Sequence, residues 1–153
     1  MRKSLLATYT KIIISILVIV ALIYVSIKFF YKEYDKHEYE TIKTNMLLIQ
    51  NKTEVIANKV EIKEKNAKYI GTKIKEKENE INIQNLIDNK IIDINSKDNI
   101  YYYLDNSNLK ELGLDNIELD SFYIVDYKKN DIIYVNGIED NSGNIVYRLS
   151  EMK

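Results

Sequence analysis

Apolar residues follow three different spacing patterns along the chain, and each pattern predicts a different structural element. The first is an uncharged run of sixteen residues, 12–27, which stands between Lys11 and Lys28. In a helix that rises about 1.5 Å per residue the run spans roughly 24 Å, and the aromatic residues 29–31 extend it toward the ~30 Å of a hydrocarbon core. We therefore expect a membrane-spanning helix over residues 12–31, anchored by Ile12, Leu17, Leu22, Ile27, Lys28, Phe29 and Phe30.

Two alternatives apply to the same run. A cleaved secretory signal needs a shorter apolar core followed by small residues in an A-x-A pattern, and no such pattern follows Ile27. A buried core helix needs apolar partners around its whole circumference, and the rest of the chain carries too little apolar surface to supply them. A membrane-spanning helix fits the run better than either alternative does.

Basic residues predict the direction of this helix. Arg2, Lys3 and Lys11 precede the run, and the first acidic residue of the chain is Glu33. Because basic residues that flank a span stay on the cytoplasmic side, we expect residues 1–11 to form a short cytoplasmic tail. Residues 32–153 are then expected to lie on the extracytoplasmic side of the cell membrane.

The second spacing pattern runs from Tyr39 to Val60, where apolar residues stand alternately three and four positions apart. This spacing is typical of an amphipathic or coiled-coil helix. It predicts an amphipathic helix within residues 32–80, which is regular to about residue 66 and highly charged near residues 72–80. The residues expected to pack or to oligomerise are Ile42, Met46, Ile49, Ile56 and Val60.

A second apolar row also repeats every seven residues and consists of Leu48, Val55, Ile62 and Tyr69. On a helical wheel it lies about 100° from the first row, so the two rows form a face about 160° wide. A helix that packs on a sheet or in a bundle uses a face of this width, whereas a two-stranded coiled coil needs a narrower one. We expect packing on a sheet; the polar residues between the rows keep the coiled coil open as an alternative.

The third pattern consists of short segments rich in β-branched and aromatic residues, which predict strands at 122–127, 131–135 and 145–149. Short turns separate them, which predicts an antiparallel meander of three strands. Before the meander we expect a short helix within 81–92, a strand at 100–104 and a helical turn at 109–114 closed by Gly113. The predicted fold class is α+β, with the long helix packed on a small C-terminal sheet in a domain over residues 81–153.

Composition excludes several classes of function. The chain has no cysteine and a single histidine, His37, so thiolate chemistry, disulfides and a zinc site built on these ligands are not expected. Residues 32–153 hold 18 basic and 23 acidic side chains, a net charge of −5, which argues against nucleic acid as a partner. All four glycines stand alone, so no glycine-rich phosphate loop exists.

Two groups of polar residues could form a site, and each has a simpler interpretation. Residues 140–144 carry oxygen ligands for calcium but lack the alternating acids of an EF-hand loop, so we expect a turn. A solvated acidic edge is the expected role of Asp115, Glu118 and Asp120, because neither a base nor a nucleophile accompanies them. We expect no enzyme, no cofactor and no small-molecule substrate.

The order of elements resembles that of type IV pilins and type II secretion pseudopilins. The segment TNMLLIQNKTEVIANKV, residues 44–60, is similar to the pilin helix where it leaves the membrane and packs on the sheet. Residues 112–114 and the segments FYIVDY, DIIYVNGI and YRLSEM resemble the C-terminal region of pseudopilin-like proteins. The resemblance implies a single-pass structural or assembly component of a bacterial surface or secretion apparatus. Its implied partners are the lipid bilayer and other membrane-anchored subunits, copies of itself included.

The N-terminal region differs from that of pilin precursors. Residues 3–11 contain no glycine at which a prepilin would be processed, and residues 12–27 contain no glutamate. A second class of protein shares the short tail, the single span and the outer heptads, namely a bitopic coiled-coil scaffold of the cell envelope, as at division sites. The two classes differ in whether the outer helix packs on the sheet or associates with another chain.

Overall fold

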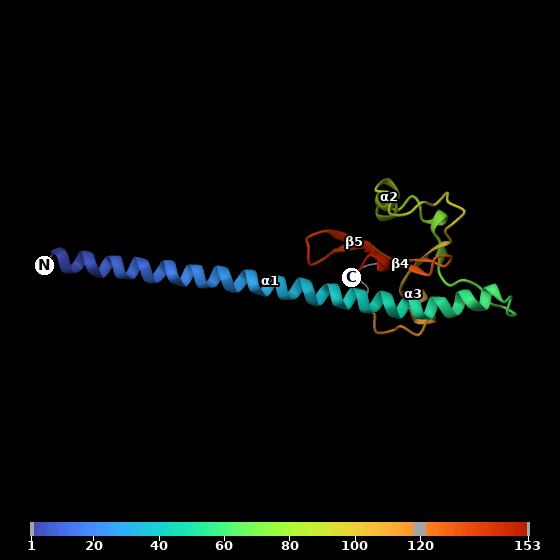
Figure 1. The fold of residues 1–153 in the computed structure, drawn as a ribbon, viewed down its shortest axis with the longest axis horizontal. Helices are drawn as coiled ribbons and strands as arrows, with labels where there is room; N and C mark the ends of the chain where they lie inside the picture. The colour runs from blue at the N-terminus through green and yellow to red at the C-terminus, as the bar shows by residue number, and fades with distance from the viewer. Residues whose placement is uncertain (1, 118–121, 153) are drawn as a thin grey trace. The chain divides into compact units, whose positions relative to one another are not determined.

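The computed structural model describes residues 2–117 and 122–152. Contacts divide the chain into two units, Met1–Glu38 and Tyr39–Lys153, and helix α1 contributes to both. The fold is α+β (Figure 1). The elements in chain order are α1 (Arg2–Glu61), β1 (Thr72–Lys73), the 3-10 helix η1 (Ile74–Glu76), α2 (Ile81–Asp88), β2 (Tyr101–Leu104), α3 (Asn106–Glu111), β3 (Tyr123–Asp126), β4 (Asp131–Glu139), β5 (Ile145–Arg148) and the 3-10 helix η2 (Leu149–Glu151).

Helix α1 ends at Glu61, earlier than the sequence pattern predicts. Lys63 adopts a positive φ of 54°, its N–H donates to the carbonyl of Val60, and the N–H of Glu64 donates to that of Lys59. These two bonds are those of a Schellman cap, which normally uses glycine at the position of Lys63. The expected charged helical end over residues 72–80 is therefore wrong: that segment holds strand β1 and the 3-10 helix η1 instead.

The sheet has five antiparallel strands in the order β1-β2-β3-β4-β5. The three predicted C-terminal strands are confirmed, but the sheet is larger than a three-stranded meander because β2 and the two-residue strand β1 extend it. Strand β4 also continues to Glu139, through positions that the sequence pattern assigns to a turn. The predicted strand at 100–104 and the helix within 81–92 are present. The helical turn expected at 109–114 lies earlier, as α3 at Asn106–Glu111, and Gly113 after it has the positive φ of a helix cap.

Both faces of the sheet are buried, and this explains why its central strands are apolar without alternation. Along β3, Tyr123 and Val125 point into one apolar cluster, and Ile124 points into a second. The first cluster contains Tyr39, Met46 and Ile49 of α1, and the second contains Ile83 and Leu86 of α2. The sheet therefore lies between the Tyr39–Glu61 part of α1 and α2, as Figure 1 shows.

The chain between α1 and β1 is held by aromatic contacts. The hydroxyl of Tyr127 donates to the carbonyl of Ile70 at 2.9 Å, and the N–H of Ile70 donates back to it at 3.1 Å. The ring of Tyr69 stacks on that of Tyr127 with 4.4 Å between centroids. Burial raises the pKa of Tyr127 to about 12.

Ile49→Ala tests the packing of α1 on the sheet. Ile49 is fully buried, so removing most of its side chain should lower the free energy of unfolding by about 2–5 kcal/mol. The matched control is Val55→Ala on the same helix, where the side chain is 52% exposed and the expected change is within about 0.5 kcal/mol. Urea unfolding followed by tyrosine near-UV circular dichroism measures both, and equal effects would contradict this packing.

Candidate functional site

The apolar stretch of α1 exposes every large apolar side chain that the structure describes between residues 13 and 27. The exposed fractions run from 50% at Ile27 to 66% at Tyr24, with Leu17 and Leu22 at 62% each. Lys11 and Lys28 at its two ends are also exposed, whereas the side chains of Ile12, Phe29 and Phe30 lie outside the described residues. An apolar surface that surrounds a helix needs a covering other than water.

One polar group within this stretch is satisfied by the helix itself. The hydroxyl of Ser26 donates to the carbonyl of Leu22 at 2.8 Å. Such a bond to the preceding turn lets serine enter an apolar environment without an unpaired donor.

Across the part of the chain that the structure describes, no helix combines the length and the apolarity that a membrane crossing requires.

The predicted packing residues of α1 lie on the side that faces the sheet. Met46 and Ile49 are fully buried in the first apolar cluster, and Ile42 and Ile56 pack against it while partly buried. Val60, one turn later, is half-buried. This row is therefore occupied by strands of the same chain.

Polar side chains of α1 add directional contacts to this packing. Thr53 is completely buried, and its hydroxyl donates to the carbonyl of Ile49 at 2.9 Å. The Nε2 of Gln50 donates to the carbonyl of Asn130, in the turn between β3 and β4, at 2.7 Å. Burial raises the pKa of Tyr123 to about 12 although a hydrogen bond with Asn45 opposes the shift. The contacts of Gln50 and Asn45 join the helix to β3 and the turn after it, whereas the Thr53 bond stays within the helix and satisfies a buried hydroxyl.

The second row of α1 differs from the expectation that both rows would pack. Leu48 is 44% exposed, Val55 is 52% exposed and Ile62 is 75% exposed. Tyr69 lies beyond the end of the helix and packs, half-buried, on Tyr127. The sheet covers only one side of a helix, and the direct contacts of Met46, Ile49 and Thr53 turn this row away from it.

A buried ion pair that the sequence pattern did not reveal joins the ends of two strands. The Nη1 of Arg148 in β5 donates to the Oδ2 of Asp131 in β4 at 2.9 Å, and the Nη2 donates to the carbonyl of Ile91 at 2.5 Å. The backbone N–H and the hydroxyl of Ser150 also donate to Asp131, at 3.1 and 3.0 Å. Burial lowers the pKa of Arg148, but hydrogen bonds with Tyr101 and Asp131 outweigh it and raise the pKa overall. In the sequence, this ion pair is indicated only by an acidic residue at the start of one apolar strand and a basic residue at the end of the next.

The remaining predicted polar groups are placed as follows. Residues 140–144 form a turn in which Oδ1 of Asp140 accepts the N–H groups of Ser142 at 2.8 Å and Asn144 at 2.9 Å. The backbone N–H of Asn144 lowers the pKa of Asp140. Asp115 and His37 are exposed, and Glu118 and Asp120 lie outside the described residues. No group of three or more potential metal ligands occurs among the residues that the structure describes.

Comparisons with known proteins add no relative to these observations. No protein-family model, no curated protein and no solved structure matches the chain.

Arg148→Met tests the buried ion pair. It leaves the Asp131 carboxylate without its cation but still hydrogen-bonded to Ile132 and Ser150, so the free energy of unfolding should fall by about 1.5–3 kcal/mol. The matched control is Lys128→Met, which removes the exposed Lys128–Asp98 pair at 3.4 Å and should cost less than about 1 kcal/mol. Urea denaturation compares them; a loss at Arg148 no larger than at Lys128 would show that the pair stabilises little.

Proposed function

We propose that the chain is a single-pass, membrane-anchored, pilin-like protein, a structural or assembly component of a bacterial surface or secretion apparatus. The observation that carries the proposal is the burial of the row Met46, Ile49 and Thr53 of α1 beneath an antiparallel sheet of the same chain. A helix that is apolar and exposed in its first part and packed in cis on a sheet in its second part suits a subunit held by lipid.

The proposed membrane anchor uses the exposed apolar stretch and its flanks. The sixteen residues 13–28 with described side chains span roughly 24 Å in a helix, less than the ~30 Å of a hydrocarbon core. Ile12 on one side and the aromatic residues 29–31 on the other lengthen the anchor by about one turn. Lys28 reaches the interface by extending its ammonium group outward.

A second candidate, the coiled-coil scaffold, is favoured by one observation. The exposed residues Leu48, Val55 and Ile62 are seven apart and present an apolar stripe away from the sheet. In a parallel pair of helices, exposed Glu54 and Lys59 would flank this stripe at positions where opposite charges attract across the seam. However, Asn51 and Asn58 would occupy the alternate core positions of the seam, which makes it weak.

Single-cysteine labelling tests the anchor and its direction, since the native chain has no cysteine. In intact bacterial cells a membrane-impermeant maleimide should label Lys110→Cys in the outer domain, but Lys3→Cys only after lysis. Leu17→Cys should stay unlabelled until detergent denatures the sample, because lipid covers it. The cysteine-free chain is the control for background. Labelling of Leu17→Cys in intact membranes would rule out the anchor, and labelling of Lys3→Cys alone would reverse its direction.

Disulfide cross-linking separates the two candidate functions. In a parallel coiled coil, Val55→Cys would face its counterpart in a second copy and oxidise to a covalent dimer. For a pilin-like subunit whose helix is packed in cis, we expect no more dimer from Val55→Cys in membranes than from the control Lys110→Cys. A dimer specific to Val55→Cys that Leu48→Asn abolishes would make the scaffold the better description.

A further inference from the structure

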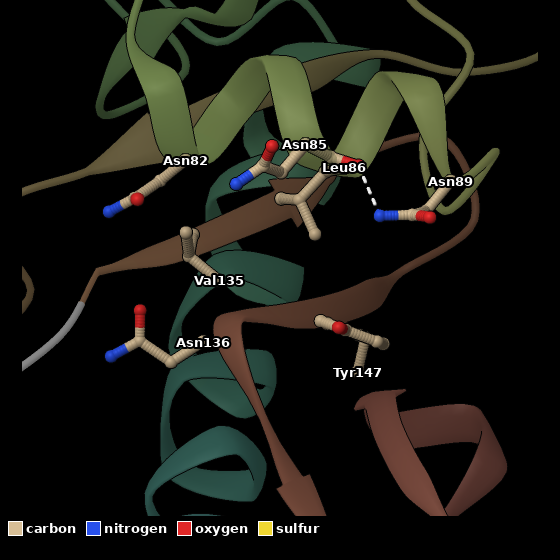
Figure 2. A pocket seen from close by; sticks show the side chains of 7 residues that line it. All are labelled: Asn82, Asn85, Leu86, Asn89, Val135, Asn136 and Tyr147. Carbon is tan, nitrogen blue, oxygen red and sulfur yellow. Dashed lines mark hydrogen bonds between the residues drawn. The ribbon is translucent and has the colours of Figure 1, made fainter.

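A pocket opens between α2 and the strands β4 and β5, on the side of the sheet opposite α1 (Figure 2). Its volume is about 550 Å³, within the range of roughly 300–1,000 Å³ in which proteins hold small ligands. The residues that line it are Asn82, Asn85, Leu86, Asn89, Val135, Asn136 and Tyr147. Four of these seven side chains are carboxamides, and none carries a charge at neutral pH.

An irregularity of the sheet builds the floor of the pocket. Ile133 of β4 pairs with Arg148 of β5, and the next pair is Ile138 with Val146, so residues 134–137 of β4 face Tyr147 alone. Gly137 has a φ of +68°, and a Cβ there would lie 2.8 Å from Cε1 of the Tyr147 ring. Glycine therefore lets this ring lie directly against β4. Bulges of this kind occur beside functional sites, where they redirect side chains.

The roof of the pocket is one face of α2. Asn82, Asn85 and Asn89 are separated by three and four residues, which places them in one row of the helix. Figure 2 shows their carboxamides along the side of α2 that faces the strands, with Asn136 opposite them. Leu86 is buried within the row and Val135 is buried on the strand side, so the polar groups surround an apolar patch.

Most of these carboxamides keep their hydrogen-bonding capacity. Among the described residues, the side chains of Asn82, Asn85 and Asn136 make no hydrogen bond, and Asn89 uses only its Nδ2, which donates to the carbonyl of Asn85 at 2.9 Å. Each free carboxamide offers two N–H donors and one carbonyl acceptor. The pocket thus presents neutral donors and acceptors side by side, around an aromatic ring and an apolar patch.

We propose that this pocket binds a neutral oligosaccharide. Each sugar hydroxyl both donates and accepts, which matches the paired donors and acceptors of a carboxamide. The C–H face of a pyranose ring matches the half-buried ring of Tyr147. The uncharged lining gives an anionic ligand no counter-ion. An extended peptide can pair with an open strand edge, and β5 forms such an edge beside the pocket, so a peptide is the competing ligand in the test.

Saturation-transfer NMR on the full chain in lipid nanodiscs tests the proposal. Nanodiscs are needed because the head groups of glycoside detergents are themselves sugars. The probes are N,N′,N″-triacetylchitotriose, maltotriose and mannotriose, with acetyl-tetraalanine amide as the peptide probe. We expect at least one trisaccharide to receive saturation at millimolar concentration, with its ring protons as the strongest signals, and the peptide to receive none.

Two double variants locate the binding. Asn82→Ala with Asn136→Ala removes carboxamides that hold no other contact, so the domain should stay folded by tyrosine circular dichroism while the trisaccharide binds roughly tenfold more weakly or not at all. The matched control, Asn51→Ala with Asn58→Ala, removes exposed carboxamides from α1 and should leave binding unchanged. Absence of signal from all three trisaccharides, equal binding by both variants, or binding of the peptide alone would overturn the proposal.

Discussion

The contact between one row of α1 and the sheet is the interaction on which the rest of the unit Tyr39–Lys153 depends. Met46 and Ile49 are fully buried there, and each contributes about 1.5–3 kcal/mol by leaving water. Without the helix, the same face of the sheet would expose Tyr123, Val125 and Ile132, which are also fully or almost fully buried. The same cluster contains Leu109 of α3 and the following residues Leu112, Leu114 and Ile117, so α1 and this segment together cover that face of the sheet.

The ion pair of Arg148 links this core to the opposite face of the sheet. Its guanidinium binds Asp131 at the start of β4 and also the carbonyl of Ile91, just beyond α2. Because Tyr147 precedes Arg148, the same contacts that hold β5 to β4 also hold the segment after α2 close to the Tyr147 ring. The contacts of Arg148 with Asp131 and Ile91 therefore help to hold Tyr147 and α2 in place on the two sides of the asparagine-lined pocket.

The sequence predicted the elements whose patterns are local. The strands β3, β4 and β5 were predictable because β-branched and aromatic residues dominate them, and the Met46 row because helical spacing repeats over several turns. The end of α1 was not, since the segment after Glu61 is rich in helix-forming lysine and glutamate, and Lys63 adopts a conformation that glycine usually takes. Periodicity alone also could not decide which of the two apolar rows would face the sheet.

The pocket was hidden from the sequence for a different reason. Its asparagines come from residues 82–89 and from Asn136, about fifty positions apart, and only the sheet brings them together. Asparagine is common in turns and exposed helices, so no single position stands out. Gly137 was assigned to a turn, and its role became visible only when β4 was seen to continue past it against Tyr147.

The two-residue strand β1 has a consequence for how the sheet meets neighbouring molecules. It forms one edge of the sheet, and its second residue, Lys73, is exposed. A long, flat, uncharged edge invites strands of neighbouring molecules to add to it, which leads to aggregation. An edge this short, with a lysine on it, offers too few free backbone groups for that addition. At this edge, therefore, the sheet does not extend into a second molecule by strand addition; β5 forms the opposite edge.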